Sequence, residues 1–264
     1  DGIYSNVRFN DNEGRTKDEN RQCLLVLMGA TAGGTKELIA VVDGHRESEL
    51  SWKEVLLSLK ARGLMHAPEL AIGDGALGFW KALEQVFPGT RIQRCTVHKT
   101  ANVLNKLPKS IQPQAKRMLH DIWKAPTKDE GGKAFDLFEK TFEAKYEECV
   151  KCLKKDRDVL LTFFDFPAEN WCHIRTTNPI ESTFATIRLR HRKTKGNGSA
   201  TASLTMMFKL AQSASKGWRK LRGHHHIPDL IRGVKFIDGV NEHQLKEEDV
   251  KPSQTRTTQT EIVA

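Results

Sequence analysis

Short apolar runs alternate with amphipathic segments along the first hundred residues, and after that the alternation stops. The strand-like runs are rich in β-branched and other apolar residues, and they span residues 3–9, 22–31, 36–44, 68–74 and 90–98. Apolar residues recur at helical spacing in residues 48–63 and 76–87. Three strands followed by helix, strand, helix and strand predict the α/β class, with a mixed sheet flanked by helices.

From residue 99 to about residue 165 the pattern is helical throughout, with segments near 111–124, 130–149 and 150–164. We therefore expect an all-helical insertion, followed by two helices that return to the sheet, one after Asn178 and one across 200–223. The expected organisation is a first part of the core at 1–105, the insertion at 106–170, the returning helices at 171–240 and a polar, disordered tail at 241–264.

The distribution of charge indicates a polyanionic partner. The net charge is +9, and between Ser182 and Pro228 there are ten Lys or Arg residues and no Asp or Glu. The rest of the chain holds 42 − 10 = 32 basic residues against 33 acidic ones, so the excess lies in one block. Such a block is typical of a nucleic-acid-binding surface, while a solvated face or an anionic membrane surface are the alternatives.

Composition excludes two other classes of protein. No apolar run is long enough to span a bilayer, and the five cysteines are odd in number and scattered, which argues against a disulfide framework. Both features indicate a soluble protein of a reducing cytoplasm. The chain starts at Asp1 without a methionine, so we expect a fragment whose upstream part is missing.

Three acids from distant parts of the chain are candidates for a metal site. Asp1 lies at the start of the first strand, Asp74 ends the fourth between Gly73 and Gly75, and Glu181 opens the basic block. Two divalent cations about 3.5–4 Å apart cleave phosphodiesters efficiently, and they need carboxylate ligands. Asp1 could instead be a terminal residue without a role, and Asp74 could close a turn or cap the helix at Ala76.

For Glu181 a local role competes with a metal role. Asn178 can cap a helix that has Pro at its first position and Glu181 at its third, which is a capping box. At 100° per residue, however, Arg188 and Arg192 lie within about 20° of Glu181. An apolar stripe about 90° away would pack on the sheet, and it consists of Ile180, Phe184 and Ile187. This geometry places a row of phosphate-binding side chains beside the acid.

Long blocks of the sequence resemble the bacterial insertion-sequence transposases of the Mutator-like superfamily. The blocks run in the family's order from Asp1 to about Gly239, and they include "DGIYSNVR", "LAIGDGALGFWKAL", "FPGTRIQRCTVHKTANVLNKLPKS", "FDFPAENWCHIRTTNPIESTFATIRLRHRKTKG" and "MMFKLAQSASKGWRKLRG". The resemblance implies an RNase H-like core with a helical insertion between its second and third acids. It also implies that a family N-terminal region, which binds the transposon ends, is absent from this truncated chain.

The resemblance further implies a DDE active site that uses two Mg²⁺ or Mn²⁺ ions. Asp1, Asp74 and Glu181 would be the triad and the metal ligands, and Cys95 and His98 match a family Cys-x-x-His motif. The reaction would be cleavage at terminal inverted repeats and transfer of the freed 3′-OH into target DNA. The phosphate-contacting residues would be Arg188, Arg190, Arg192, Lys193 and Lys195. Double-stranded DNA would be the partner, bound by a homodimer or larger assembly in the bacterial cytoplasm, on the nucleoid and away from membranes.

Other interpretations remain open at the level of sequence. The chain could be a truncated, inactive DNA-binding relic of such a transposase. Cys95 and His98 could form a Cys₃His zinc site with Cys149 and Cys152, although thiols in a helical pattern more often pack in a core. His98 would otherwise lie at the end of the fifth strand beside the active site, and the tract 224–226 of three histidines is expected to be a solvated loop rather than a metal site.

Overall fold

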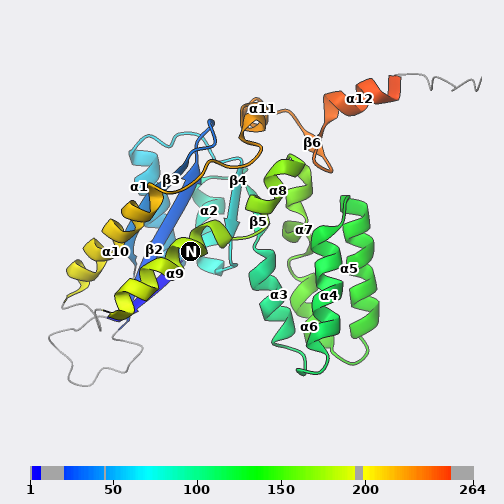
Figure 1. Ribbon diagram of the computed structural model, residues 1–264, viewed down its shortest axis with the longest axis horizontal. Helices are drawn as coiled ribbons and strands as arrows, with labels where there is room; N and C mark the ends of the chain where they lie inside the picture. Colours follow the sequence, from blue (N-terminus) through cyan, green and yellow to red (C-terminus); the bar gives the residue numbers. More distant parts are fainter. Residues whose placement is uncertain (1, 7–20, 45, 194–198, 251–264) are drawn as a thin grey trace, which may run out of the picture.

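All five expected strands form, but in two separate sheets. The computed structural model describes residues 2–6, 21–44, 46–193 and 199–250 (Figure 1). An antiparallel sheet of order β1-β2-β3 consists of Gly2–Asn6, Arg21–Ala30 and Lys36–Gly44. A parallel pair consists of β4 (Leu70–Gly73) and β5 (Arg91–Arg94). The described part of the chain is thus mixed α/β, and the two sheets are not joined by strand pairing within it.

Strand β2 packs helices on both of its faces because successive side chains of a strand point to opposite sides. Leu25 belongs to one core, with α1 (Glu49–Ala61) and α2 (Leu77–Val86). Leu24 and Val26 belong to another, with α9 (Asn178–Lys193) and α10 (Ala200–Ser215). The three-stranded sheet therefore lies between two helical layers.

The apolar stripe expected on α9 is confirmed. Phe184 and Ile187 are buried against Leu24 and Val26 of β2, and Ile180 packs beside them. Helix α10 ends at Ser215, earlier than expected, because the Leu221 N–H donates to the Gly34 carbonyl (2.9 Å) in the turn between β2 and β3. The chain after α10 thereby leaves the helix to pack on the sheet.

Residues 96–174 are helical and form a body of their own beside the sheets (Figure 1). Its α-helices are α3 (Thr96–Leu104), α4 (Gln112–Lys124), α5 (Lys128–Phe142), α6 (Glu147–Lys154), α7 (Arg157–Leu160) and α8 (Trp171–Ile174). Two 3₁₀ turns, η1 (Thr162–Asp165) and η2 (Ala168–Asn170), precede α8. Buried phenylalanines fill its core, among them Phe135, Phe138, Phe163 and Phe164.

Two expectations for helical boundaries differ from the structure. The helix expected at 130–149 is broken after Phe142, whose carbonyl accepts hydrogen bonds from the N–H groups of Lys145 and Tyr146 and so closes a turn. Residues expected to be disordered after 241 include a helix, α12 (Glu242–Val250).

The C-terminal part folds back onto the helical body. It contains η3 (His224–His226), α11 (Ile227–Ile231) and a hairpin of β6 (Phe236–Ile237) and β7 (Val240–Asn241). Backbone hydrogen bonds join Gly239 to Phe164 and Ala168, each at 3.1 Å. Within the described ranges, no helix combines the length and the apolar composition that crossing a membrane requires.

One half-buried carboxylate links the helical body to the parallel strands. Asp156, between α6 and α7, lies 2.5 Å from Lys99 Nζ on α3 and 3.1 Å from Arg94 Nε on β5. The two cationic side chains are only 4% and 8% exposed. Lys99 Nζ also donates to the Cys152 carbonyl at 2.7 Å. Two buried cations therefore depend on a single anion.

Replacing Asp156 by Asn is expected to lower the free energy of unfolding by about 3 kcal/mol, because it leaves both buried cations uncompensated. The exposed pair Arg157–Asp136, at 2.5 Å, provides the matched control. Asp136→Asn should cost at most about 1 kcal/mol. Urea denaturation of the three proteins measures the difference, and equal losses in both variants would contradict the assigned role of Asp156.

Candidate functional site

The carboxyl ends of β4 and β5 place two candidate residues at the same edge of the parallel pair. Asp74 follows β4 directly and Cys95 follows β5, and the strands are parallel with Gly73 opposite Arg94. The Cys95 N–H donates to the Gly73 carbonyl at 2.8 Å, which holds the two strand ends together. Carboxyl ends of parallel strands are where α/β proteins bind ligands.

Asp74 lies in a turn that requires glycine at position 75. The Ala76 N–H donates to Asp74 Oδ1 at 3.1 Å, and Gly75 has a φ of +95°. The guanidinium of Arg94 occupies the space that a Cβ on Gly75 would need. The turn interpretation of Asp74 is therefore confirmed, and a carboxylate that accepts one such bond retains a second oxygen.

Glu181 reaches the site from the first turn of α9. The helix cap lies one residue earlier than expected, at Thr177 instead of Asn178. The helix begins at Asn178, so Thr177 holds the cap position, and Thr177 O accepts from the N–H of Glu181 at 3.1 Å. The Asn178 N–H donates to Thr176 Oγ1 at 3.4 Å instead of to Glu181. The expectation of a capping box between Asn178 and Glu181 was wrong.

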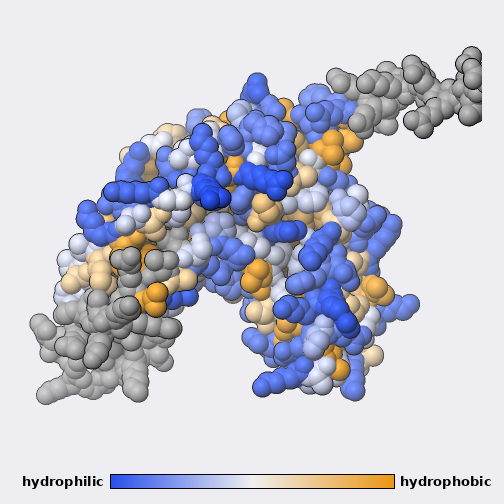
Figure 2. Space-filling view, in the orientation of Figure 1, coloured by the Kyte–Doolittle hydropathy of each residue, from blue (hydrophilic) through white to orange (hydrophobic). Residues whose placement is uncertain are grey.

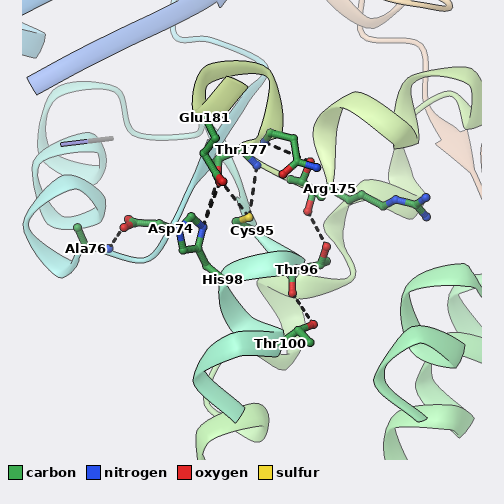
Figure 3. A network of polar contacts seen from close by, with 11 residues as sticks. Asp74, Ala76, Cys95, Thr96, His98, Thr100, Arg175, Thr177 and Glu181 are labelled. Carbon is green, nitrogen blue, oxygen red and sulfur yellow. Dashed lines mark hydrogen bonds and ion pairs between the residues drawn. The ribbon is translucent and has the colours of Figure 1, made fainter. Parts of the chain in front are cut away.

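Thr177 is the centre of the polar network that surrounds Glu181 (Figure 3). Its hydroxyl donates to Glu181 Oε1 in a short hydrogen bond, and it lies 3.3 Å from both Cys95 Sγ and His98 Nδ1. Its backbone N–H also donates to Cys95 Sγ at 3.3 Å. A hydroxyl has one proton, and the bond to an ionised carboxylate is the strongest of these contacts. The oxygen of Thr177 can then accept from His98.

His98 lies beside Glu181 and Thr177 (Figure 3). Its Nδ1 is 3.6 Å from Glu181 Oε1. The pKa of His98 is raised, first by the hydrogen bond with Cys95, against the opposing effect of burial, and then by the negative charges of Cys95, Glu181 and Asp74. Burial opposes ionisation of the Cys95 thiol, yet hydrogen bonds from His98 and Thr177 outweigh it and lower the pKa of Cys95.

The expected position of His98 at the end of the fifth strand was wrong. The strand ends at Arg94, Cys95 caps α3, and His98 lies in the first turn of that helix. The chain leaves the strand because the Thr96 N–H and hydroxyl both donate to the Arg175 carbonyl, at 2.9 and 3.0 Å. The three-residue spacing of Cys95 and His98 then brings both side chains to the same side of the helix start.

Glu47 is a further acid of the site that sequence reasoning missed. It lines a cavity of about 120 Å³ together with Asp74 and Thr177. The pKa of Glu47 is raised, first by burial and then by the charge of Asp74. Its carboxylate occupies the space that a Cβ on Gly2 would need. The start of β1, the residue after Asp1, therefore lies against the same acidic group that faces Asp74.

The remaining predicted site residues are only partly described. Asp1 and Lys195 lie outside the described residues, as do the side chains of Arg190, Arg192 and Lys193. Arg188 is exposed on α9, with its guanidinium 5.8 Å from the Phe184 ring centroid. The row of cations beyond Glu181 therefore stays a prediction, apart from the exposure of Arg188.

The structure bears out core packing for Cys149, the interpretation that the helical pattern favoured, and not the alternative Cys₃His zinc site. Cys149 is fully buried in the phenylalanine-rich core, and burial, followed by the charge of Cys152, raises the pKa of its thiol to about 12. Among the described residues, Cys95 and His98 group with Glu181 rather than with the cysteines of α6. Cys149 is a packing residue.

Residues 1–220 match the family described as "Transposase, Mutator family". The chain belongs to this family. The transposase for insertion sequence element IST2 of Acidithiobacillus ferrooxidans is 53% identical over 223 residues, which cover 84% of this chain and 75% of that protein. The transposase for IS6120 of Mycolicibacterium smegmatis is 49% identical over 239 residues, covering 90% and 71%. The transposase for ISRM5 of Rhizobium meliloti is 26% identical over 215 residues, covering 81% and 54%.

In this Mutator-family chain, Cys95→Ser is expected to lower the pKa of His98, because the thiol is the main cause of its elevation above 6.5. Protonation of His98 stabilises the folded state. This stabilisation is fully present below about pH 6.5 and is lost as the pH rises through the raised pKa of His98. An NMR pH titration of the His98 ring measures the shift. Cys172→Ser, an exposed cysteine, is the control, and an unchanged His98 pKa in Cys95→Ser would contradict the assignment.

Proposed function

We propose that this Mutator-family chain is the catalytic domain of a DDE-type DNA transposase with an RNase H-like core, in which residues 106–170 are the helical insertion. Asp1, Asp74 and Glu181 would hold two Mg²⁺ or Mn²⁺ ions. The observation that carries the proposal is that Asp74, from a strand end, and Glu181, from a helix more than a hundred residues later, both act electrostatically on His98, whose Nδ1 lies 3.6 Å from Glu181 Oε1. Neither acid has an arginine or lysine at salt-bridge distance among the described residues.

The ligands present fit hard divalent cations. Asp74 and Glu181 offer carboxylate oxygens, and one oxygen of each accepts a hydrogen bond that fixes its orientation. Gly2 supports the placement of Asp1 near them, because Gly2 contacts Glu47 and Glu47 faces Asp74. Two such ions, when bound, activate the attacking oxygen of a phosphodiester displacement and stabilise the leaving one.

The residues of the chain itself would orient the acids and the DNA. Thr177 holds Glu181, and His98 supplies a positive charge beside Glu181 when it is protonated. Figure 2 shows a hollow, with many hydrophilic side chains on its walls, between the helical body and the part built on β2 and α9. A DNA duplex in this hollow would contact Arg188 on α9. The reaction would be hydrolysis at the terminal inverted repeats, followed by transfer of the 3′-OH into target DNA by a dimer or larger assembly.

Calorimetric titration with Mn²⁺ tests the metal site directly. The parent should bind Mn²⁺, and Asp74→Asn and Glu181→Gln should each weaken binding at least about tenfold, or about 1.4 kcal/mol. Glu84→Gln, an exposed acid of α2, should bind like the parent. The two site variants should also abolish Mg²⁺-dependent nicking of DNA that carries the transposon ends.

The opposite result has a defined meaning. If the parent binds DNA but no Mn²⁺, and Glu181→Gln changes only the melting temperature, Glu181 is a structural partner of Thr177. The chain would then be an inactive DNA-binding relative of a transposase. Retention of Zn²⁺ that is lost in Cys95→Ser would instead assign the Cys95–His98–Glu181 group to a zinc ion.

Thr177 offers a test of positioning within the same site. Thr177→Val keeps the shape and the backbone N–H but removes the hydroxyl that donates to Glu181. We expect nicking to fall by about 10- to 100-fold in kcat with little change in KM for DNA, the range typical of losing a residue that orients a metal ligand. Thr177→Ser should restore most of the activity. Equal losses in both variants would contradict the assigned role, because Thr177→Ser keeps the hydroxyl.

A further inference from the structure

A second cluster of metal-binding side chains lies away from the catalytic acids. Glu169 of η2 and two histidines of η3, His225 and His226, bring their ligand atoms within 4.8 Å of one another. They are more than fifty residues apart in sequence, so the tertiary fold assembles them. Along the chain, η2 leads directly into α8 and η3 leads directly into α11, both labelled in Figure 1.

The backbone around the cluster is held in place by contacts that do not use its ligand atoms. Asn170 Nδ2 donates to the Arg222 carbonyl at 2.6 Å, and the Arg222 N–H donates to His173 Nε2 at 3.1 Å. Gly223 has a φ of +69°, and a Cβ there would lie 2.6 Å from Glu169 Cβ. The turn before η3 therefore packs directly on η2.

Only two of the three consecutive histidines face Glu169. The His226 ring makes an edge contact with buried Phe236, with ring centroids 5.7 Å apart. The centroid of the His225 ring lies 4.1 Å from that of His226. His224 is turned toward other groups: its Nδ1 is 3.1 Å from the Leu221 carbonyl, and its Cβ packs against Gly34. The three consecutive histidines therefore have different surroundings, and only His225 and His226 are close to Glu169.

We propose that Glu169, His225 and His226 bind a borderline transition-metal ion of the Zn²⁺ class. Two imidazoles and one carboxylate are a ligand set that Zn²⁺ accepts at about 2.0–2.2 Å, whereas Mg²⁺ and Mn²⁺ prefer oxygen ligands. Ligand atoms up to 4.8 Å apart must move inward to share an ion, and Glu169 and His225 are exposed enough to rotate. The ion would join η2 to η3 and so fasten the C-terminal part to the helical body.

The test is calorimetry with Zn²⁺ and Co²⁺ absorption spectroscopy on the full chain at neutral pH. We expect one ion to bind at this cluster, with affinity at least about tenfold weaker in Glu169→Gln and in His225→Asn. His224→Gln is the matched control because it shortens the histidine tract without removing a ligand, and it should bind as the parent does. Zn²⁺ should raise the melting temperature of the parent and of His224→Gln, but not of Glu169→Gln.

Three results would overturn the proposal. If Glu169→Gln binds as tightly as the parent, the histidine tract alone is responsible. If Zn²⁺ binding is lost in Cys95→Ser and kept in Glu169→Gln, the ion belongs to the Cys95–His98–Glu181 group. If the parent does not bind Zn²⁺, there is no site. The first and third results leave Mn²⁺ binding by Asp74 and Glu181 untouched. The second would also assign Glu181 to a zinc ion, so the Mn²⁺ titration of the parent distinguishes failure of this proposal from failure of the catalytic one.

Discussion

The carboxylate of Asp156 is the contact on which the position of the candidate site depends. It is the shared anion for Lys99 and Arg94, which are buried on either side of Cys95 in the sequence. Arg94 in turn fills the space beneath Gly75, beside Asp74. Through these two side chains, a residue of the helical body fixes both the start of α3 and the turn that presents an acid. The helical body thus supports the geometry of the strand ends.

Those features that follow from periodicity could be predicted from sequence. The apolar run that includes Leu24 and Leu25 predicts a strand, and the stripe that includes Phe184 predicts the buried face of α9. Asp74 was identifiable because it ends an apolar run between two glycines. Each of these inferences uses only neighbours along the chain, and the local pattern agrees with the tertiary structure.

Tertiary hydrogen bonds account for most of what sequence could not predict. His98 was expected in a strand, but the carbonyl of Arg175 draws Thr96 out of the extended conformation and starts a helix. Thr177 contacts Cys95 and His98, and Glu47 is affected by Asp74, all of them distant in sequence, so nothing in the local pattern distinguishes Thr177 or Glu47. The same holds for Glu169, whose contact with the histidines depends on the left-handed turn at Gly223.

The order of the acids along the chain has a consequence during synthesis. Asp74 belongs to the first third of the chain and Glu181 to the last third, and the whole helical body is made between them. A nascent chain that has folded β1 to β5 and α1 to α8 still lacks the carboxylate of α9. On the proposed function, a polypeptide that stalls or is truncated before that point has no complete metal site. On that function, the chain could cleave DNA only after the first turn of α9 has been made.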